Sequence, residues 1–407
     1  MNSLASPYRL ATETDVIRPL LDKVRALQPW LADRAAQTEA EGRVSAEATR
    51  KLVNADLYRL GQPRRYGGFE LPPSSQFRLG FEVGRVCPST AWCAIIANSM
   101  GWLISYWPEQ AQQDVWGDNP RNIIAGTFSP TASCSTTEGG YLVTGSWPFA
   151  SNCDNADWVF VGSWFPEDSP NAGGPGWFLV PRSDVMIDHD SWNVSGMQGT
   201  GSKTLYTTEP IFIPEHRALS FVDIIRDSTP GRAIEGNVAA RFNFGTFGCI
   251  VLAAPILGAA QGAIDWFRSA MSEKVKISLK PGAKATAADN PDTQRRAGEA
   301  QTRLDAALAL LLTDLAPLEA KIMEGGTLTV EERIRVRRCA AFAAEQGRAV
   351  VNMIWESSGA SSAYADVPLQ RLWRDVNMGA NHTTLDVGGI YRMAGQHIFG
   401  LEPAGSY

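Results

Sequence analysis

The chain has 407 residues, of which 44% are hydrophobic and 20% charged, so it can bury a large core, and its length favours two or three structural units. The 43 acidic and 37 basic side chains give a net charge of -6, which argues against a nucleic-acid partner. No apolar run approaches the roughly 18 residues that cross a bilayer, and the first residues lack the apolar core of a signal peptide. We therefore expect a cytoplasmic protein without a membrane segment.

The cysteines and histidines do not have the spacing of metal ligands. The six cysteines are scattered without a C-x-x-C pair, and the four histidines never stand four residues apart. We expect reduced thiols that mostly pack in the core, and no metal site.

The first part of the chain has the apolar spacing of helices. One face of a first helix is formed by Ile17, Leu20, Val24, Leu27 and Leu31. Ser45 is a suitable N-cap for a second helix running through Leu60, and Ser89–Trp107 reads as a third, buried helix. These segments predict an N-terminal helical domain over residues 1–120.

From about Asn122 the pattern changes to short β-like runs, namely NIIAGTF, GGYLVTGSWPF, DWVFVGSWF, GWFLV and TLYTTEPIFI. Gly, Pro, Asn and Asp separate the runs at intervals typical of a small antiparallel barrel or sandwich. A central β domain is therefore expected over residues 121–231.

After about Arg232 the helical pattern returns with VLAAPILGAAQGAIDWFRSAM, whose small residues permit close helix contact. A polar loop, KPGAKATAADNPDTQRR, precedes long helices around Ala300–Leu315 and Val330–Trp355. Such helices predict a C-terminal four-helix bundle over residues 232–407, of a kind that often continues across a subunit interface. The fold class is α+β.

This order of helices, β domain and helices, with PLQRLWRD near the end, resembles the acyl-CoA dehydrogenase fold. Within that superfamily the chain is most similar to the oxygenase component of two-component flavin-dependent monooxygenases. The segments that carry this resemblance are GGYLVTGSWPFASNCDNADWVFVG, SWNVSGMQGTGSKTL with FIPEHR, PILGAAQGAIDWF and VPLQRLWRDVNMGANH. The resemblance implies that reduced FAD or FMN reacts with O2 to form a C4a-hydroperoxyflavin, which hydroxylates an indole or a phenol.

Two other functions stay open at this stage. One is an acyl-CoA or nitroalkane-type flavin dehydrogenase or oxidase, and the other is a subunit that only stores flavin or serves as a scaffold. Many acyl-CoA dehydrogenases carry a glutamate base at the position that corresponds to Thr383, counted from Arg374. The absence of a carboxylate at this position makes a dehydrogenase less well supported than an oxygenase.

His382 matches the histidine for which the aromatic oxygenases are known. A histidine with a pKa near 6.5 suits a base that draws the proton from a phenol or indole, which makes the ring more electron-rich. The alternative is a histidine that only satisfies a hydrogen bond at a helix end.

The resemblance also implies the residues that face the flavin. Phe149 and Ala150 would offer their backbone, and the Ser151 hydroxyl would lie near flavin N5. Thr200 and Ser202, in the GMQGTGS stretch, would meet the polar edge of the flavin. The alternatives are a serine bonded within its own turn and an ordinary hairpin loop.

The GMQGTGS stretch has neither the spacing of a Rossmann fingerprint nor the Lys-Ser/Thr of a phosphate loop. We expect no NAD(P)H site, so a separate NAD(P)H:flavin reductase must supply the reduced flavin.

Arginine donors near the C-terminus form a second group of cofactor candidates. Gln370 and Arg374 suit a flavin phosphate or a buried carboxylate, although the Arg374 and Asp375 pair is more often structural in the resembled fold. Arg295 and Arg296 would reach the flavin phosphate of a neighbouring subunit, or form a solvated basic patch. A homotetramer or homodimer is expected.

Candidate residues for the wall of the substrate pocket are Asn98, Met100, Trp147 and Thr383. Met100 stands where the oxygenases often have a further histidine. This departure favours a less polar aromatic over a phenol carboxylate.

Overall fold

The computed structural model describes residues 16–275 and 285–407. The expectation about a signal peptide falls on the first 15 residues, and the first part of the predicted polar loop falls on residues 280–284, so both lie outside the described residues.

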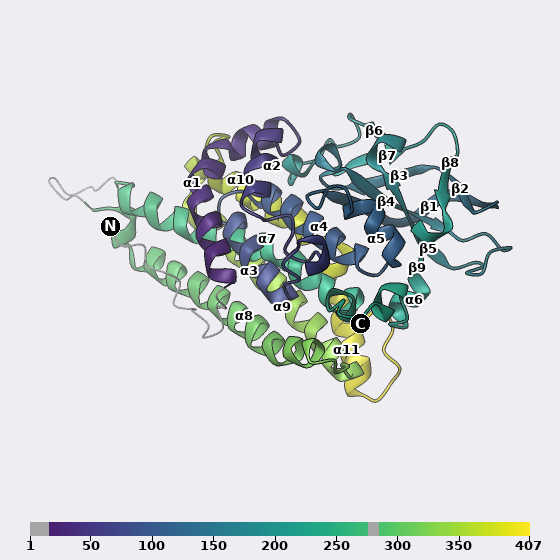
Figure 1. Ribbon diagram of the computed structural model, residues 1–407. Helices are drawn as coiled ribbons and strands as arrows, with labels where there is room; N and C mark the ends of the chain where they lie inside the picture. The colour runs from purple at the N-terminus through teal and green to yellow at the C-terminus, as the bar shows by residue number, and fades with distance from the viewer. Residues whose placement is uncertain (1–15, 276–284) are drawn as a thin grey trace.

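Helices come first, strands follow, and helices return (Figure 1). The first helices are α1 (Ile17–Ala40), α2 (Ala46–Asn54), α3 (Pro73–Gly84), α4 (Pro88–Ile104) and α5 (Glu109–Trp116). The strands are β1 (Ile124–Thr137), β2 (Gly140–Thr144), β3 (Ser146–Ala150), β4 (Trp158–Trp164), β5 (Pro175–Pro181), β6 (Met186–Asp188), β7 (Lys203–Tyr206), β8 (Ile211–Pro214) and β9 (Ala218–Ser220). The later helices are α6 (Phe221–Ile225), α7 (Phe244–Glu273), α8 (Pro291–Met323), α9 (Val330–Ser358), α10 (Pro368–Gly379) and α11 (Val387–Ile398).

The N-terminal helices follow the predicted apolar spacing where it was strongest. Ser45 caps α2 as predicted, since its hydroxyl accepts a hydrogen bond from the Ala48 amide at 3.2 Å. The prediction that this helix runs to Leu60 is wrong, because α2 ends at Asn54 and Asp56 has a φ of 67°, outside helical space. The short helices α3 and α5 were not predicted.

The β domain contains two sheets, with strand orders β8-β2-β1-β4-β5-β9 and β3-β7-β6. The expectation of purely antiparallel pairing is wrong at one place. β1 pairs antiparallel with β2 but parallel with β4, where Ile124 stands opposite Trp158. The register of that parallel pair shifts between Gly126 and Ala132, so the larger sheet curls.

The long helix α7 forms the centre of the helical part. Its small residues act as predicted, since a Cβ on Gly258 would lie 2.3 Å from the Phe81 carbonyl oxygen, and one on Gly262 would lie 2.1 Å from that of Arg85. α3 can therefore pack directly on the α7 backbone. The expectation that no apolar segment approaches membrane-spanning length is wrong, because α7 is long and apolar enough: an 18-residue window has a mean hydropathy of 1.8. Since 94% of that window is buried inside the protein, packing accounts for its apolar character.

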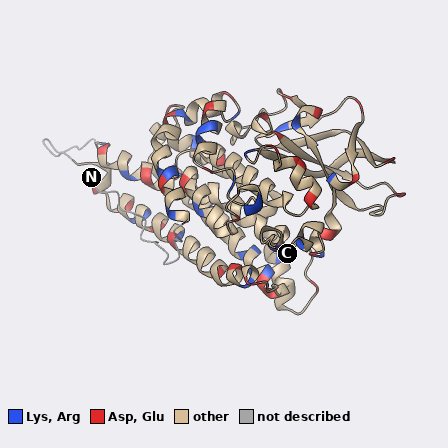
Figure 2. Cartoon of the chain, in the orientation of Figure 1, with Lys and Arg blue, Asp and Glu red and all other residues tan. Residues whose placement is uncertain are grey.

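Charged residues of both signs are interspersed over the helices, and the orientation of Figure 2 shows no face of a single sign. Arg295 and Arg296 lie on α8 and not in a loop, and both bond Asp292 within that helix. Their contacts are those of an exposed helical face.

Candidate active site

A cluster of three hydroxyls forms where β3 ends and β7 begins. The Ser202 Oγ lies 2.7 Å from the Ser151 Oγ and 2.7 Å from the Thr200 Oγ1. Thr200 also donates a hydrogen bond to the Met197 carbonyl at 2.8 Å. All three hydroxyl residues are buried. The structure thus brings together three of the residues predicted to face the flavin.

The turn after β3 presents one exposed aromatic ring beside these hydroxyls. Phe149 has a φ of 66° and 67% of it is exposed, while Ala150 is buried behind it. The Asn152 amide donates to the Thr200 carbonyl at 3.0 Å, which ties this turn to the neighbouring loop. The rings of Phe149 and Trp192 lie edge to face, with their centres 6.0 Å apart.

The glycines of the GMQGTGS loop are required by close packing. A Cβ on Gly196 would lie 2.3 Å from the carbonyl oxygen of Arg374, and one on Gly199 would lie 2.6 Å from the Thr38 Cγ2. Gly201 has a φ of 51°. The loop therefore rests against α10 and α1, and this contact places Thr200 and Ser202.

Trp92 on α4 joins the hydroxyl cluster to His382. Its indole Nε1 donates to the Ser151 Oγ at 3.2 Å. The Trp92 and His382 rings also lie edge to face, with the ring centres 5.6 Å apart. Sequence reasoning missed Trp92, because an aromatic on an apolar helix reads as core. Its position between two predicted residues becomes visible only in three dimensions.

His382 stands at the start of a 3-10 turn, Thr383–Leu385, and its Nδ1 accepts a hydrogen bond from the Thr384 amide at 3.2 Å. Burial, and then the charge of Arg337, lower the pKa of His382 to about 4. The imidazole is therefore neutral near pH 7. Since the accepting Nδ1 carries no proton, the neutral ring carries it on Nε2, which makes that nitrogen a donor. The expected pKa near 6.5 is therefore wrong, whereas the role of His382 as a base stays a prediction.

The lowered pKa of His382 gives a testable dependence of stability on pH. The unfolded histidine binds a proton below pH 6.5, whereas the folded one resists it until about pH 4, so stability is lost as the pH falls through this window. We expect wild type to lose roughly 3 kcal/mol more than His382→Gln between pH 7 and pH 4. Urea denaturation at several pH values measures this, and parallel curves for the two proteins would contradict it.

Gln370 and Arg374 bond within the protein. The Gln370 Oε1 accepts from Arg374 Nε at 2.9 Å and from its Nη2 at 2.6 Å. Arg374 Nη1 donates to Glu39 and to the Ser195 carbonyl, the latter at 2.9 Å. The structural alternative for this arginine is therefore supported, and these donors are not available to a flavin phosphate.

Asp375, on α10, also holds the GMQGTGS loop against this helix. One carboxylate oxygen accepts from the Met197 amide at 2.5 Å and the other from the Ser89 hydroxyl at 3.3 Å. Burial raises the pKa of Asp375 to about 6.

The predicted substrate residues do not gather around His382. The Asn98 amide bonds the backbone of Leu57, Leu60 and Ala94. Met100 is buried in a hydrophobic cluster that also includes Leu103 and Trp116.

Trp147 is fully buried in the β domain, where its Nε1 donates to the Gly162 carbonyl at 2.8 Å. Thr383 is exposed next to His382. Only Thr383 thus lies beside the histidine, and the other three side chains have the contacts of core residues.

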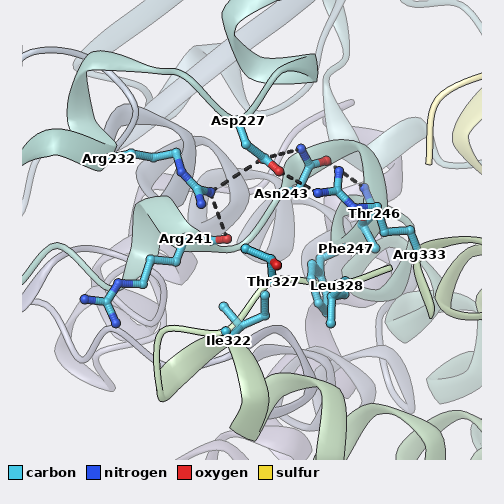
Figure 3. Close-up of a pocket in the computed structure, with 11 residues that line it drawn as sticks. Asp227, Arg232, Arg241, Asn243, Thr246, Phe247, Ile322, Thr327, Leu328 and Arg333 are labelled. Atoms are coloured by element: carbon cyan, nitrogen blue, oxygen red, sulfur yellow. Dashed lines mark hydrogen bonds and ion pairs between the residues drawn. The ribbon is translucent and has the colours of Figure 1, made fainter. Parts of the chain in front are cut away.

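A surface pocket opens elsewhere, at the N-terminal end of α7 (Figure 3). Asp227 accepts hydrogen bonds there from Asn243 at 2.8 Å and Arg333 at 2.6 Å. None of the residues predicted for the site lines this pocket.

Among residues 16–275 and 285–407, no group of three potential metal ligands comes together, and all six cysteines are free thiols.

The site has features that fit a flavin. Phe149 offers an exposed apolar ring, the three hydroxyls offer donors and acceptors beside it, and the buried Nδ2 of Asn152 has no hydrogen-bond partner. A planar ring system with one apolar and one polar edge matches this combination.

Comparison with known proteins defines the class. Residues 17–118 match the N-terminal domain model of the acyl-CoA dehydrogenases, and residues 250–387 match the C-terminal domain model. The oxygenase subunit HsaA of a flavin-dependent monooxygenase from Mycobacterium tuberculosis is 33% identical over 94% of this chain and 96% of its own length. The FADH2-dependent resorcinol hydroxylase oxygenase component from a Rhizobium strain is 32% identical over the full length of both chains.

Solved structures of flavin-dependent monooxygenases have the same fold as this chain. The crystal structure of HsaA from M. tuberculosis superposes with a TM-score of 0.88, at 32% identity over 96% of this chain and 99% of its own. XiaF from Streptomyces, in complex with FADH2, superposes with a TM-score of 0.87 at 26% identity, over 96% of this chain and 98% of its own. The chain belongs to the acyl-CoA dehydrogenase family. Within it, the protein is the oxygenase component of a reduced-flavin-dependent monooxygenase, so the dehydrogenase and scaffold hypotheses are not supported.

Proposed function

We propose that this protein hydroxylates a small aromatic substrate, a phenol or an indole, which binds beside His382 while the flavin binds beside Ser151. The observation that supports this arrangement is the Trp92 indole, which contacts both residues. Reduced flavin, when bound, supplies the electrons that activate O2 for transfer of one oxygen atom. A separate NAD(P)H:flavin reductase supplies it.

Ser151 would hold the proton on flavin N5. Its hydroxyl is oriented from two sides, by Trp92 Nε1 as a donor and by Ser202 as a partner at 2.7 Å. Thr200 donates to the Met197 carbonyl, so Ser202 donates to Thr200 and Ser151 donates to Ser202. The Ser151 oxygen, which accepts from Trp92, therefore keeps one lone pair free to accept a hydrogen bond. Retention of the N5 proton slows the loss of hydrogen peroxide that competes with hydroxylation.

Replacing this hydroxyl should uncouple the reaction. For Ser151→Ala we expect peroxide release to accelerate by roughly tenfold, which corresponds to one lost hydrogen bond of about 1.4 kcal/mol. Stopped-flow absorbance with a peroxide assay measures the rate, and the exposed Ser183→Ala is the matched control. An unchanged rate in Ser151→Ala would remove Ser151 from this role.

His382 would act as a donor to the substrate oxygen. Its Nδ1 is engaged by the Thr384 amide, so Nε2–H is the group that can point to a substrate. A hydrogen bond to a phenol oxygen stabilises the negative charge that grows there as the ring attacks oxygen. The buried Trp92 ring beside it helps to exclude water.

The proposed function is tested by adding oxygen to an anaerobic mixture of protein and reduced flavin. A long-lived near-ultraviolet absorbance, followed by a hydroxylated phenol or indole, is the expected result. Immediate appearance of oxidised flavin without product, whatever aromatic is present, would contradict it.

We also propose a cytoplasmic homotetramer or homodimer. The C-terminal end exposes Ile398, Phe399 and Leu401, which is unusual for a protein surface unless it is covered. Light scattering on the purified protein measures the oligomeric state.

A further inference from the structure

Arg337, on a buried face of α9, carries a charge that the described residues do not neutralise. Only 8% of the residue is exposed, and its Nε has no hydrogen-bond partner. No carboxylate among the described residues lies within ion-pair distance of it. A buried guanidinium is normally paired, because an unpaired charge loses its hydration without compensation. One turn earlier on α9, Arg333 shows the usual arrangement, with Nη2 donating to Asp227 at 2.6 Å.

The neighbours of Arg337 do not supply the missing negative charge. The Cys249 thiol on α7 lies within hydrogen-bonding reach, but burial raises the pKa of this thiol, so it stays neutral. The other neighbour is His382, whose pKa the charge of Arg337 helps to lower. The 3-10 turn that follows His382 packs on α9, so Arg337 and His382 stand on adjacent elements, and no anionic acceptor is found for Arg337 among the described residues.

The pocket of Figure 3 is lined in part by the two helices that carry Cys249 and Arg337, α7 and α9. Thr246 and Arg333 line that pocket, and they stand one helical turn before Cys249 on α7 and Arg337 on α9. Thr246 is fully buried, and its Oγ1 has no partner. The segments of α7 and α9 next to the pocket therefore carry two buried polar atoms without a partner, Thr246 Oγ1 and Arg337 Nε, which a polar ligand would satisfy.

We propose that Arg337 binds a negatively charged oxygen of the aromatic substrate. The inference rests on the proposed function and names its substrate class. Two groups offer this chemistry, a phenolate formed from the reacting hydroxyl and a carboxylate elsewhere on the molecule. The planar guanidinium fork suits either one. A less polar aromatic, which Met100 favoured in the sequence, leaves Arg337 without a partner.

For a phenolate, Arg337 would also activate the ring. A neighbouring positive charge favours the ionised form of the substrate hydroxyl, which raises the electron density of the ring. The proton then passes to water or buffer as the substrate binds. Ionisation of the substrate beside Arg337 removes the need for a strong base, and His382 with its lowered pKa is a weak one.

The first experiment uses 4-nitrophenol, whose phenolate is coloured, with the flavin-free protein. We expect wild type to lower the pKa of the bound phenol by about one unit or more, and Arg337→Met to abolish that shift. The matched control is Arg338→Gln, which removes an exposed charge from the next position of the same helix.

The second experiment compares 3-(4-hydroxyphenyl)propionate with its methyl ester, by quenching of tryptophan fluorescence. If the carboxylate is the partner, Arg337→Met weakens binding of the acid by about tenfold or more and leaves the ester unchanged. An effect in either experiment identifies the source of the negative oxygen. The proposal is overturned if Arg337→Met changes neither the pKa of bound 4-nitrophenol nor the affinity for the acid. It is also overturned if wild type binds neither probe.

Folding and the proposed function are separated by two further measurements. Removal of an unpaired buried charge should raise the Tm of Arg337→Met, whereas loss of a structural ion pair would lower it. Arg337→Lys keeps the charge without the fork and should bind both probes with intermediate affinity. Because binding is measured without flavin, failure of the near-ultraviolet absorbance would contradict the proposed function alone.

Discussion

His382→Ala is expected to form product roughly a hundredfold more slowly than wild type, while the near-ultraviolet absorbance with reduced flavin and oxygen persists. The reason is that the variant loses the Nε2–H donor to the substrate oxygen but keeps the Ser151 side of the site. His382→Gln should recover much of the lost rate, because the glutamine amide can donate from about the same place but cannot accept a full proton. Single-turnover product analysis by rapid quench measures all three proteins.

The glutamine variant separates two roles for the histidine. If His382 takes the proton as a base, His382→Gln will be as slow as His382→Ala, and the donor role is wrong. His397→Ala is the control, since it removes a histidine from the C-terminal helix α11. Equal yields in His382→Ala and wild type would exclude His382 from the reaction.

Gly196→Ala is expected to destabilise the protein by roughly 2 to 4 kcal/mol. Its methyl group would lie 2.3 Å from the Arg374 carbonyl oxygen, so the loop must move away from α10. That movement strains the bond from the Met197 amide to Asp375 and shifts Thr200 and Ser202. Urea denaturation measures the loss, and peroxide release should rise with it.

The matched control is Gly298→Ala. Gly298 lies within α8, and a Cβ there would have no heavy atom within 4 Å, so alanine should stabilise the helix by about 0.5 to 1 kcal/mol. Gly196→Ala with wild-type stability would show that α10 does not hold the loop in place.

The parts of the fold that sequence could predict are those with a strong local signal. The apolar spacing of α1 and the Ser45 cap depend on near neighbours in the chain, and the run of small residues in α7 is itself a local pattern that indicates close packing. Strands β6 and β9 are only three residues each, too short for a visible alternation. The parallel pairing of β1 with β4 depends on segments far apart, and no local pattern specifies it.

The site divides in the same way. Ser151, Thr200 and Ser202 were predicted by resemblance, and the structure places their hydroxyls in one cluster. Asn98 and Trp147 are polar or aromatic residues of the kind that line pockets. Their N–H groups instead donate to backbone carbonyls of residues distant in the sequence.

The chemistry of His382 depends on tertiary surroundings. Its proton position follows from the Thr384 amide, and its lowered pKa follows from burial and from Arg337. Neither is visible in the residues WRDVNMGANH.

We propose that one flavin and one aromatic substrate bind next to each other, beside Ser151 and His382, with Trp92 in contact with both residues. A crystal structure with flavin and a phenol should place flavin N5 within hydrogen-bonding distance of the Ser151 Oγ, and the phenol oxygen within hydrogen-bonding distance of His382 Nε2. A phenol bound out of reach of His382, or a flavin that does not contact Ser151, would show that this arrangement is wrong.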